Sequence, residues 1–291
     1  VTRNNTHAPV AKTFLEAGFH VVCDKPLCFT LAEGRKLRDI VNKSGKVFAL
    51  THNYTGYPMI RQAREMIERG DLGDLRLIHV EYIQDWLSED LESEGIKQAE
   101  WRTDPKQAGA GGAIGDIGTH AFNLLSFVSG LDTEALSADL HSFVDGRQVD
   151  DNAHILLRLE GGARGVIWAS QVAVGRENSL SLRIYGDRGG LEWCQENPNQ
   201  MRFSRFGAAP QILTRGGAGL GEGADRWTRI PPGHPEGYLE GFANVYSDAA
   251  DLITGSNVGR LLPGIDAALD GMWFISACQA SSRNDAVWVR K

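Results

Sequence analysis

The sequence predicts an α/β protein made of two units: a short unit with a parallel sheet, then a larger α+β unit with an open, mainly antiparallel sheet. Residues 1–52 alternate helix patterns with short apolar runs, an order that produces parallel strands. Residues 135–204 hold several strand-type segments separated by glycine pairs, which is typical of hairpins. A chain of 291 residues is long enough for two domains of about 100 to 150 residues each. We place the domain boundary after residue 52, which leaves residues 53–291 for the larger unit.

The first unit is predicted to hold two helices and two strands. In chain order these are a helix over residues 6–17, a strand over 20–23, a helix over 30–43 and a strand over 46–51. The second helix begins at Thr30, with Glu33 three residues later, as in a capping box. Asp24, Lys25 and Pro26 follow the first strand directly. Because ligands bind at the carboxyl ends of strands in open α/β sheets, Lys25 is expected at a site.

The second unit is predicted to be longer and richer in strands. Helices are expected over residues 58–69, from 116 to about 130, from 234 to about 252 and over 264–281. Strands are expected over residues 75–84, 135–143, 153–159, 163–171, 179–185, 190–194 and 287–289. Polar loops are expected over residues 85–112 and 207–235.

Residues 109–120 read Gly-Ala-Gly-Gly-Ala-Ile-Gly-Asp-Ile-Gly-Thr-His. The glycines leave room for a ligand or another stretch of backbone to come close. If the segment is helical from Asp116 onward, Asp116 and His120 lie one above the other on a single face, because they are four residues apart. A carboxylate and an imidazole placed in this way can share a proton. An aspartate in such a position is also a common helix N-cap, and the sequence leaves both interpretations open.

Composition excludes several classes of function. A formal net charge of −7 and a pI near 5.6 argue against nucleic acid as a partner, because phosphate backbones are bound by clustered lysines and arginines. No stretch approaches the roughly 18 apolar residues that a membrane span needs. The four cysteines (Cys23, Cys28, Cys194 and Cys278) show neither CxxC spacing nor a His-rich neighbourhood. We therefore expect no metal site, no disulfide framework and a cytoplasmic location.

Two motifs together carry a family resemblance. Asp24-Lys25-Pro26 and residues 111–120 resemble the Glu-Lys-Pro and Gly-Gly-xxx-Asp-x-Gly-x-His motifs of the glucose-fructose oxidoreductase, inositol dehydrogenase and rhizopine catabolism (Gfo/Idh/MocA) family. The resemblance implies a partial Rossmann-type domain that binds NAD or NADP, and a carboxyl-terminal domain whose sheet builds homodimers or homotetramers. It also implies hydride transfer between the nicotinamide cofactor and a secondary hydroxyl of a sugar, inositol or related polyol.

The chain departs from the family pattern in three places. Asp24 stands where the family has glutamate, and Arg3 replaces the usual proline in a turn that Asn4 and His7 otherwise match. The family's glycine-rich phosphate loop is absent, and the pattern implies roughly 80 to 90 further residues before Val1. We therefore expect this chain by itself to bind nucleotide poorly and to be inactive alone.

By the resemblance, Lys25, Asp116 and His120 are the catalytic residues. His120 suits the base that takes the hydroxyl proton, because the ordinary pKa of histidine is near 6.5. The Lys25 ammonium stabilises the developing alkoxide, and Asp116 binds a neighbouring hydroxyl or orients the pair. Residues expected to bind the cofactor are Asn4, His7, Asp24, Lys25, Pro26, Asn53, Trp101 and Arg102. Residues expected to bind the substrate are Lys25, Tyr54, Gln84, Asp116, His120 and His234.

Two other classes of function remain open at this stage. One is a non-catalytic regulator that senses a sugar or nucleotide on the same fold, although such a sensor has no need of Lys25, Asp116 and His120 together. The other is a metal-dependent isomerase or hydrolase, with Asp116, His120 and His52 around an ion. That alternative lacks a convincing third ligand in the sequence.

Overall fold

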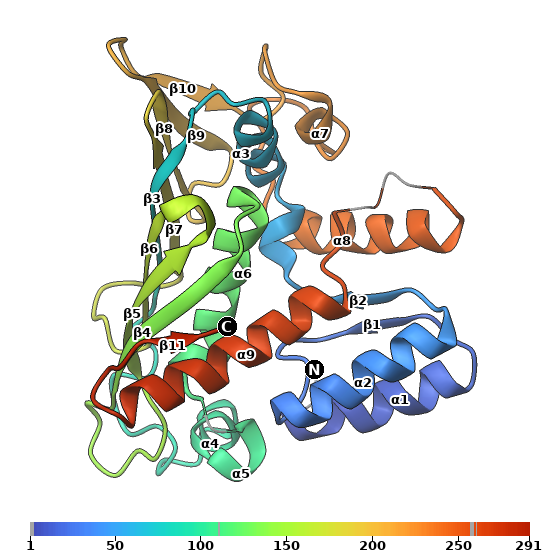
Figure 1. The fold of residues 1–291 in the computed structure, drawn as a ribbon, viewed down its shortest axis with the longest axis vertical. Helices are drawn as coiled ribbons and strands as arrows, with labels where there is room; N and C mark the ends of the chain where they lie inside the picture. Colours follow the sequence, from blue (N-terminus) through green and yellow to red (C-terminus); the bar gives the residue numbers. More distant parts are fainter. Residues whose placement is uncertain (1–2, 110, 257–258, 260) are drawn as a thin grey trace.

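The structure, a computed structural model, describes residues 3–109, 111–256, 259 and 261–291 of the chain. It confirms the predicted α/β class, with a small parallel sheet and a large, mostly antiparallel one. Figure 1 shows the large sheet standing at one side of the molecule and the first helices and strands at the other. Ala110, within the glycine-rich stretch, lies outside the described residues.

The first unit has the predicted alternation of helix and strand. Its elements are η1 (Asn4–Thr6), α1 (His7–Glu16), β1 (Val21–Cys23), α2 (Leu31–Ser44) and β2 (Phe48–Leu50). The two strands pair in parallel, with Val21 opposite Phe48. Thr30 caps α2 as predicted, because its hydroxyl accepts a hydrogen bond from the Glu33 N–H at 3.2 Å. The Glu33 carboxylate reaches one residue further back than a capping box requires, to the N–H of Phe29 at 3.0 Å.

In the part of the chain that the structure describes, the large sheet has nine strands. In spatial order they are β10 (Gln211–Thr214), β9 (Gln200–Arg205), β8 (Gly189–Cys194), β7 (Ser179–Gly186), β3 (Leu75–Ile83), β6 (Arg164–Ser170), β5 (Asn152–Leu159), β4 (Thr133–His141) and β11 (Val289–Arg290). Only the central β3–β6 pair among them is parallel. Along β3, the buried residues Ile78, Val80 and Tyr82 alternate with more exposed ones, so one face of the sheet packs against the core.

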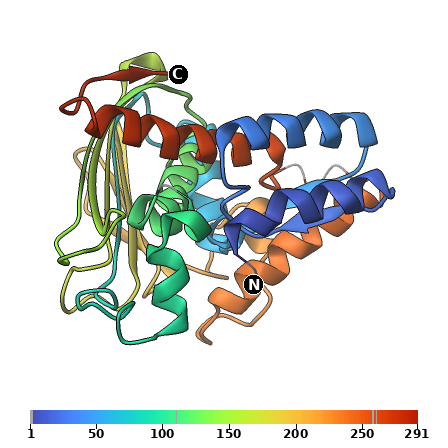
Figure 2. The ribbon, with the colours of Figure 1, turned by 90° about the horizontal axis from the view of Figure 1, so that it is seen from below.

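Three helices cover that packed face, as Figures 1 and 2 show. They are α3 (Pro58–Glu68), α6 (Thr119–Ser129) and α9 (Ile265–Ser282). The last of these also packs on α2 and β2, and the N–H of Leu50 in β2 donates to the Pro263 carbonyl at 2.8 Å. One hydrophobic core therefore joins the small sheet to the large one. Among the described residues, no helix is long and apolar enough to cross a membrane.

Residues 85–112 are not all loop, contrary to the prediction. They contain two short helices, α4 (Lys97–Thr103) and α5 (Pro105–Ala108). The Asp104 carboxylate caps the second by accepting the N–H of Lys106 at 2.9 Å. Helices of one or two turns have too few residues to show a helical period, which explains why the sequence pattern missed them.

The prediction of a loop over residues 207–235 is also partly wrong. This segment contains β10 and a short helix, α7 (Glu222–Asp225). The next helix, α8 (Tyr238–Ile253), starts four residues later than predicted. The reason lies in Glu236, whose buried carboxylate is ion-paired with Arg215 at 2.8 Å and holds the chain outside the helix up to that point. The remaining short elements are η2 (Asn53–Gly56), η3 (Ile114–Gly118) and η4 (Glu160–Gly162).

Candidate active site

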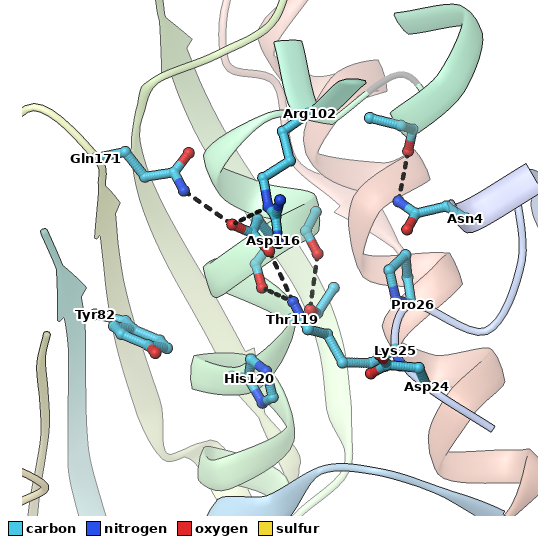
Figure 3. A network of polar contacts seen from close by, with 12 residues as sticks. Asn4, Asp24, Lys25, Pro26, Tyr82, Arg102, Asp116, Thr119, His120 and Gln171 are labelled. Atoms are coloured by element: carbon cyan, nitrogen blue, oxygen red, sulfur yellow. Dashed lines mark hydrogen bonds and ion pairs between the residues drawn. The ribbon is translucent and has the colours of Figure 1, made fainter. Parts of the chain in front are cut away.

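Lys25 lies where β1 ends and points toward the large sheet's helices, as predicted for a residue after a parallel strand. Its Nζ donates hydrogen bonds to the backbone carbonyl of Asp116 at 2.5 Å and to Oδ1 of the same residue at 2.8 Å. Figure 3 shows this contact between the two units. An ammonium has three N–H groups, so these two bonds leave one for a ligand.

Asp116 sits in a π-helical turn, η3, immediately before α6. Such widened turns release a backbone carbonyl from the helical ladder, and here the Asp116 carbonyl accepts from Lys25. The turn is anchored by Asp150, whose carboxylate accepts the N–H groups of Gly112 and Ile114, each at 2.8 Å. A Cβ on Gly112 would lie only 2.0 Å from the Asp150 carbonyl oxygen. The glycine at 112 is therefore needed for the close approach of another backbone, one of the two uses predicted for this stretch.

The second carboxylate oxygen of Asp116 also has protein partners. Oδ2 accepts from Gln171 Nε2 at 3.0 Å and lies 3.4 Å from Arg102 Nε. Burial by itself would raise the pKa of Asp116, but the nearby charges of Lys25 and Arg102, with the hydrogen bonds from Lys25 and Gln171, lower it overall. Asp116 is thus an ionised carboxylate that holds Lys25, and it caps no helix.

His120 lies one turn further on, in α6, and is buried. Burial, then the charge of Lys25 and the proximity of His52, keep the pKa of His120 well below 6.5, so the ring is neutral at neutral pH. The described residues show no contact between Asp116 and His120, so the prediction that they share a proton is wrong. Both oxygens of Asp116 are bound to other residues, and His120 Nδ1 faces His52 Nδ1 at 3.5 Å. The physical cause is the π-helical turn, because the Asp116–His120 alignment was predicted for regular α-helical spacing.

Lys25, Asp116 and His120 line one cavity of about 560 Å³. Five further residues predicted from sequence line it as well: Asn53, Tyr54 and Gln84, together with Asp24 and Arg102 from the set expected to bind the cofactor. Tyr54 Oη is hydrogen-bonded to Tyr82 Oη at 2.6 Å, and Gln84 Nε2 donates to Asn178 Oδ1 at 2.7 Å. The other lining residues are Thr51, Tyr82, Ile117, Asn178, Gln195, Tyr238 and Phe242. The cleft is therefore lined mainly by hydrogen-bonding and aromatic side chains.

His234 is the one predicted substrate residue that the structure does not bring to this cleft. Its side chain is exposed and lines a different cavity, with Arg215 and Glu236. Its carbonyl oxygen accepts a hydrogen bond from Arg215 Nη2 at 2.6 Å. Because α8 starts at residue 238, Tyr238 takes the place at the cleft that the prediction gave to His234.

Five of the residues predicted to hold a cofactor line a second cavity beside Lys25. Asn4, Asp24, Pro26, Trp101 and Arg102 line this narrow cavity, which also borders Asp116. The Arg102 guanidinium lies over the Trp101 ring, 4.2 Å from its centroid.

Hydrogen bonds hold two of these lining residues in place, and the remaining predicted cofactor residues lie elsewhere. Asn4 Nδ2 donates to the Ala108 carbonyl at 2.8 Å, and Asp24 Oδ1 accepts from the Lys25 N–H at 2.8 Å. His7 lies outside the narrow cavity, and its Nδ1 contacts the Pro26 carbonyl at 2.8 Å. Asn53 borders the larger cavity instead.

Several residues of the site were missed by sequence reasoning. Gln171 directly follows β6, so its position at the end of a strand was the one available signal. Asn178, Gln195, Tyr238 and Phe242 come from segments far from Lys25 in sequence, and only strand pairing and helix packing bring them together. Among the described residues, no group of three or more His, Cys, Asp or Glu side chains is arranged to hold a metal ion.

Three buried polar atoms at the two cavities make no hydrogen bond: Asn53 Nδ2, Gln84 Oε1 and Arg102 Nε. Buried polar atoms normally have hydrogen-bond partners, so such atoms beside a cavity are available to bind a ligand or water there. The narrow cavity combines such a guanidinium with an aromatic ring and an amide, a donor set that suits an aromatic carboxamide such as nicotinamide.

Comparison with known proteins agrees with this interpretation. Residues 1–52 match the model of the oxidoreductase family with an NAD-binding Rossmann fold. Residues 60–192 match the GFO/IDH/MocA C-terminal domain. The fold and the cleft thus place the chain among the NAD-dependent oxidoreductases.

Whole-chain relatives identify the family more closely. The chain is 35% identical to the uncharacterized oxidoreductase YfiI of Bacillus subtilis, over 99% of this chain and 76% of that protein. A crystal structure of an oxidoreductase from Sinorhizobium meliloti has 51% identity and a TM-score of 0.90, and the match covers all of this chain and 78% of that one. The chain belongs to the GFO/IDH/MocA family.

A further solved relative comes from Azotobacter vinelandii. Its structure as an inositol dehydrogenase homolog complexed with NAD+ has 38% identity and a TM-score of 0.94, covering all of this chain and 77% of that one. A complex of the same homolog with NADH and myo-inositol has 36% identity and a TM-score of 0.91, covering all of this chain and 76% of that one.

Proposed function

We propose that this chain carries the substrate site of a dehydrogenase that transfers hydride between NAD or NADP and a secondary hydroxyl of a sugar, inositol or related polyol. The observation that carries the proposal is the cleft in which Lys25, Asp116 and His120 face a wall of amide and phenol side chains. A polyol presents many hydroxyls, and such a wall supplies matching donors and acceptors. The Azotobacter vinelandii homolog that binds myo-inositol supports the same substrate class.

The three central residues have separate roles in this proposal. His120 accepts the proton of the reacting hydroxyl through Nε2, since its Nδ1 faces His52. Lys25 uses its third N–H to hold the same hydroxyl oxygen and to stabilise the negative charge that develops there. Asp116 orients the Lys25 ammonium by occupying its other two N–H groups.

The residues that would hold the cofactor are Asn4, Asp24, Pro26, Asn53, Trp101 and Arg102. When bound, the nicotinamide supplies or accepts the hydride. Asn53 Nδ2, which makes no hydrogen bond within the protein, is the donor we assign to it, and Arg102 Nε, which faces Asp116 Oδ2 at 3.4 Å, borders the same site. We assign none of these residues to the ribose, where NAD and NADP differ, so the proposal covers both cofactors.

We also propose that this chain alone has little activity. Three apolar side chains on α1 and β1 are about half exposed: Val10 (53%), Phe14 (50%) and Val22 (45%). Exposed apolar side chains on adjacent elements are typical of a surface that another segment covers. No glycine-rich phosphate loop follows a strand in residues 1–52. Titrating NADH into the chain and following its fluorescence tests this point, because tight binding would contradict it.

The sheet supports a further proposal, a homodimer or homotetramer formed through its uncovered face. Leu77 and Leu156 project from that face with 56% and 51% of their surface exposed. Light scattering on the wild type and on Leu156→Lys tests it. We expect a dimer or tetramer for the wild type and a smaller species for the variant, and a monomeric wild type would contradict the proposal.

Turnover measurements test the main proposal, in the protein with a complete first domain. We expect NAD- or NADP-linked oxidation of at least one member of a polyol and sugar panel. Lys25→Ala and His120→Ala should each lower kcat by about 10² to 10⁴-fold. Lys43→Ala, at an exposed lysine of α2, is the matched control. Near-normal rates in both site variants would refute the assigned roles, and ligand binding without any hydride transfer would favour a sensor.

A further inference from the structure

We propose that His52 is a positioning residue that holds His120 in the tautomer whose Nε2 carries no proton. The inference rests on the proposed function, in which His120 Nε2 accepts the hydroxyl proton. His52 lies between β2 and η2 and belongs to neither motif of the family resemblance. Its ring is the protein group that faces His120 Nδ1.

The two rings contact each other through the same nitrogen, Nδ1, of each ring. His52 Nδ1 lies 3.5 Å from His120 Nδ1, and the ring planes are nearly perpendicular, at 83°. Both rings are neutral at neutral pH: burial, then Lys25, lowers the pKa of His52 to about 3, and the pKa of His120 is also strongly lowered. Each neutral ring carries one proton, on either of its two nitrogens, so a hydrogen bond between the two Nδ1 atoms requires one of them to donate and the other to accept.

The two arrangements differ in what they allow His120 to do. If His120 Nδ1–H donates to His52, then His120 Nε2 has a lone pair and can accept a proton. If His52 donates instead, His120 carries its proton on Nε2 and cannot serve as the base. The positive charge of Lys25 acts on His120, and a nearby positive charge favours a lone pair over an N–H on the nitrogen closer to it. Because Nδ1 is directed to His52, Nε2 is the nitrogen left to face that charge. The first arrangement is therefore the one that the site stabilises.

The other neighbours of His120 do not compete for its nitrogens. Tyr54 and Tyr82 contact the ring with centroid separations of 5.0 and 6.2 Å. Their hydroxyls bond each other, and Tyr82 Oη donates to Asn178 Oδ1 at 2.9 Å. The charged groups around the pair are Lys25 and Asp116, which are bound to one another.

The main chain of His52 explains why its ring is available for this task. The His52 carbonyl accepts from the N–H and the hydroxyl of Thr55, at 3.1 and 2.8 Å, and its own N–H donates to Leu50. These bonds define the turn without the imidazole.

During oxidation the substrate O–H bond breaks and an N–H bond forms at His120 Nε2. The resulting imidazolium then donates a stronger, charge-assisted bond from Nδ1 to His52. A contact of 3.5 Å leaves room for this bond to shorten, as catalytic hydrogen bonds do when substrate binds.

A pair of variants tests the inference in turnover measurements. His52→Phe keeps a ring of similar size but removes the acceptor, whereas His52→Asn places an amide oxygen near the position of Nδ1. We expect His52→Phe to lower kcat by about 10- to 100-fold with little change in KM, and His52→Asn to recover most of the loss. Equal effects of the two variants, or a change in KM alone, would overturn the proposal.

A second measurement does not depend on turnover. Nitrogen-15 spectra of histidine-labelled wild type distinguish the two neutral tautomers, with His120→Gln to assign the signal. We expect the Nδ1–H tautomer for His120 in the wild type and a shift toward Nε2–H in His52→Phe. An Nε2–H tautomer in the wild type would refute the inference even if His120 proves essential. Normal turnover of His120→Ala would instead refute the proposed function.

Discussion

The close approach at Gly112 leads to a sharp prediction with a control three residues away. In Gly112→Ala, the new Cβ would lie 2.0 Å from the Asp150 carbonyl oxygen and 2.8 Å from Val149 Cγ2. In Gly115→Ala, no atom lies within 4 Å of the new Cβ. Both positions belong to the same glycine-rich stretch, so the pair separates steric conflict from a general effect of adding a methyl group there.

The magnitude follows from the bonds that must move. Relieving the clash at Gly112 pushes this backbone away from Asp150, which receives the N–H groups of Gly112, Ala113 and Ile114 at 2.8 Å each. Overpacking costs about 1 to 3 kcal/mol, and each weakened hydrogen bond about 0.5 to 1.5 kcal/mol. We therefore expect Gly112→Ala to lower the free energy of unfolding by roughly 3 to 5 kcal/mol.

Urea unfolding followed by circular dichroism measures both variants. Gly115→Ala should stay within about 1 kcal/mol of the wild type, because alanine is the better helix former. In Gly112→Ala the turn that presents Asp116 to Lys25 should shift as well, so kcat should also fall in turnover measurements. An unfolding free energy for Gly112→Ala equal to that of Gly115→Ala would refute the close-approach argument.

Three further predictions concern charge. Burial raises the pKa of Asp150 to about 6, so the stability associated with its protonated form is present below about pH 4 and is lost as the pH rises through 6. The control is Asp150→Asn, whose amide does not titrate in this range. Between pH 4 and 7.5, the free energy of unfolding of the wild type, measured in urea, should fall by up to about 3 kcal/mol relative to that of Asp150→Asn. A difference between the two proteins that stays constant with pH would contradict this. Asp248→Ala leaves the buried Arg61 without its ion-pair partner at 2.5 Å and should cost about 3 to 5 kcal/mol. Asp251→Ala breaks a more exposed pair on the same helix and should cost at most about 1 kcal/mol in the same urea unfolding measurements. Similar losses in the two variants would contradict the role of burial. Since the pKa of His120 is held well below 6.5, the acid limb of kcat/KM that His120 controls should lie below that value, and a limb at 6.5 or above would show that His120 is not the buried base.

Local chemistry made much of this fold predictable. Thr30 and Gly45 mark the ends of α2 because a cap and a left-handed glycine act within a few residues. The hairpin strands followed from alternation and glycine pairs for the same reason. Elements of one or two turns, such as α4, α5 and α7, were missed because their stability comes from contacts with the rest of the protein.

The site divides in the same way. Lys25, Asp116 and His120 were identified because two short motifs each carry their residues within a few positions. Gln171 and Tyr238 were not, because each reaches the site through the packing of another element. His52 was considered only as a ligand in the metal-dependent alternative. His234 was misplaced because the buried Arg215–Glu236 pair, 21 residues apart in sequence, delays the start of α8.

The sequence by itself determined the α/β class, the family resemblance and the three central residues of the cleft. Only the tertiary structure decided how those residues are paired. The i, i+4 spacing predicted that Asp116 and His120 contact one another. Instead, Asp116 lies in a π-helical turn anchored by Asp150 and binds Lys25, whereas His120 contacts His52. The physical reason is that a hydrogen bond depends on where side chains meet in space, and a single widened turn changes that without changing a letter of the motif.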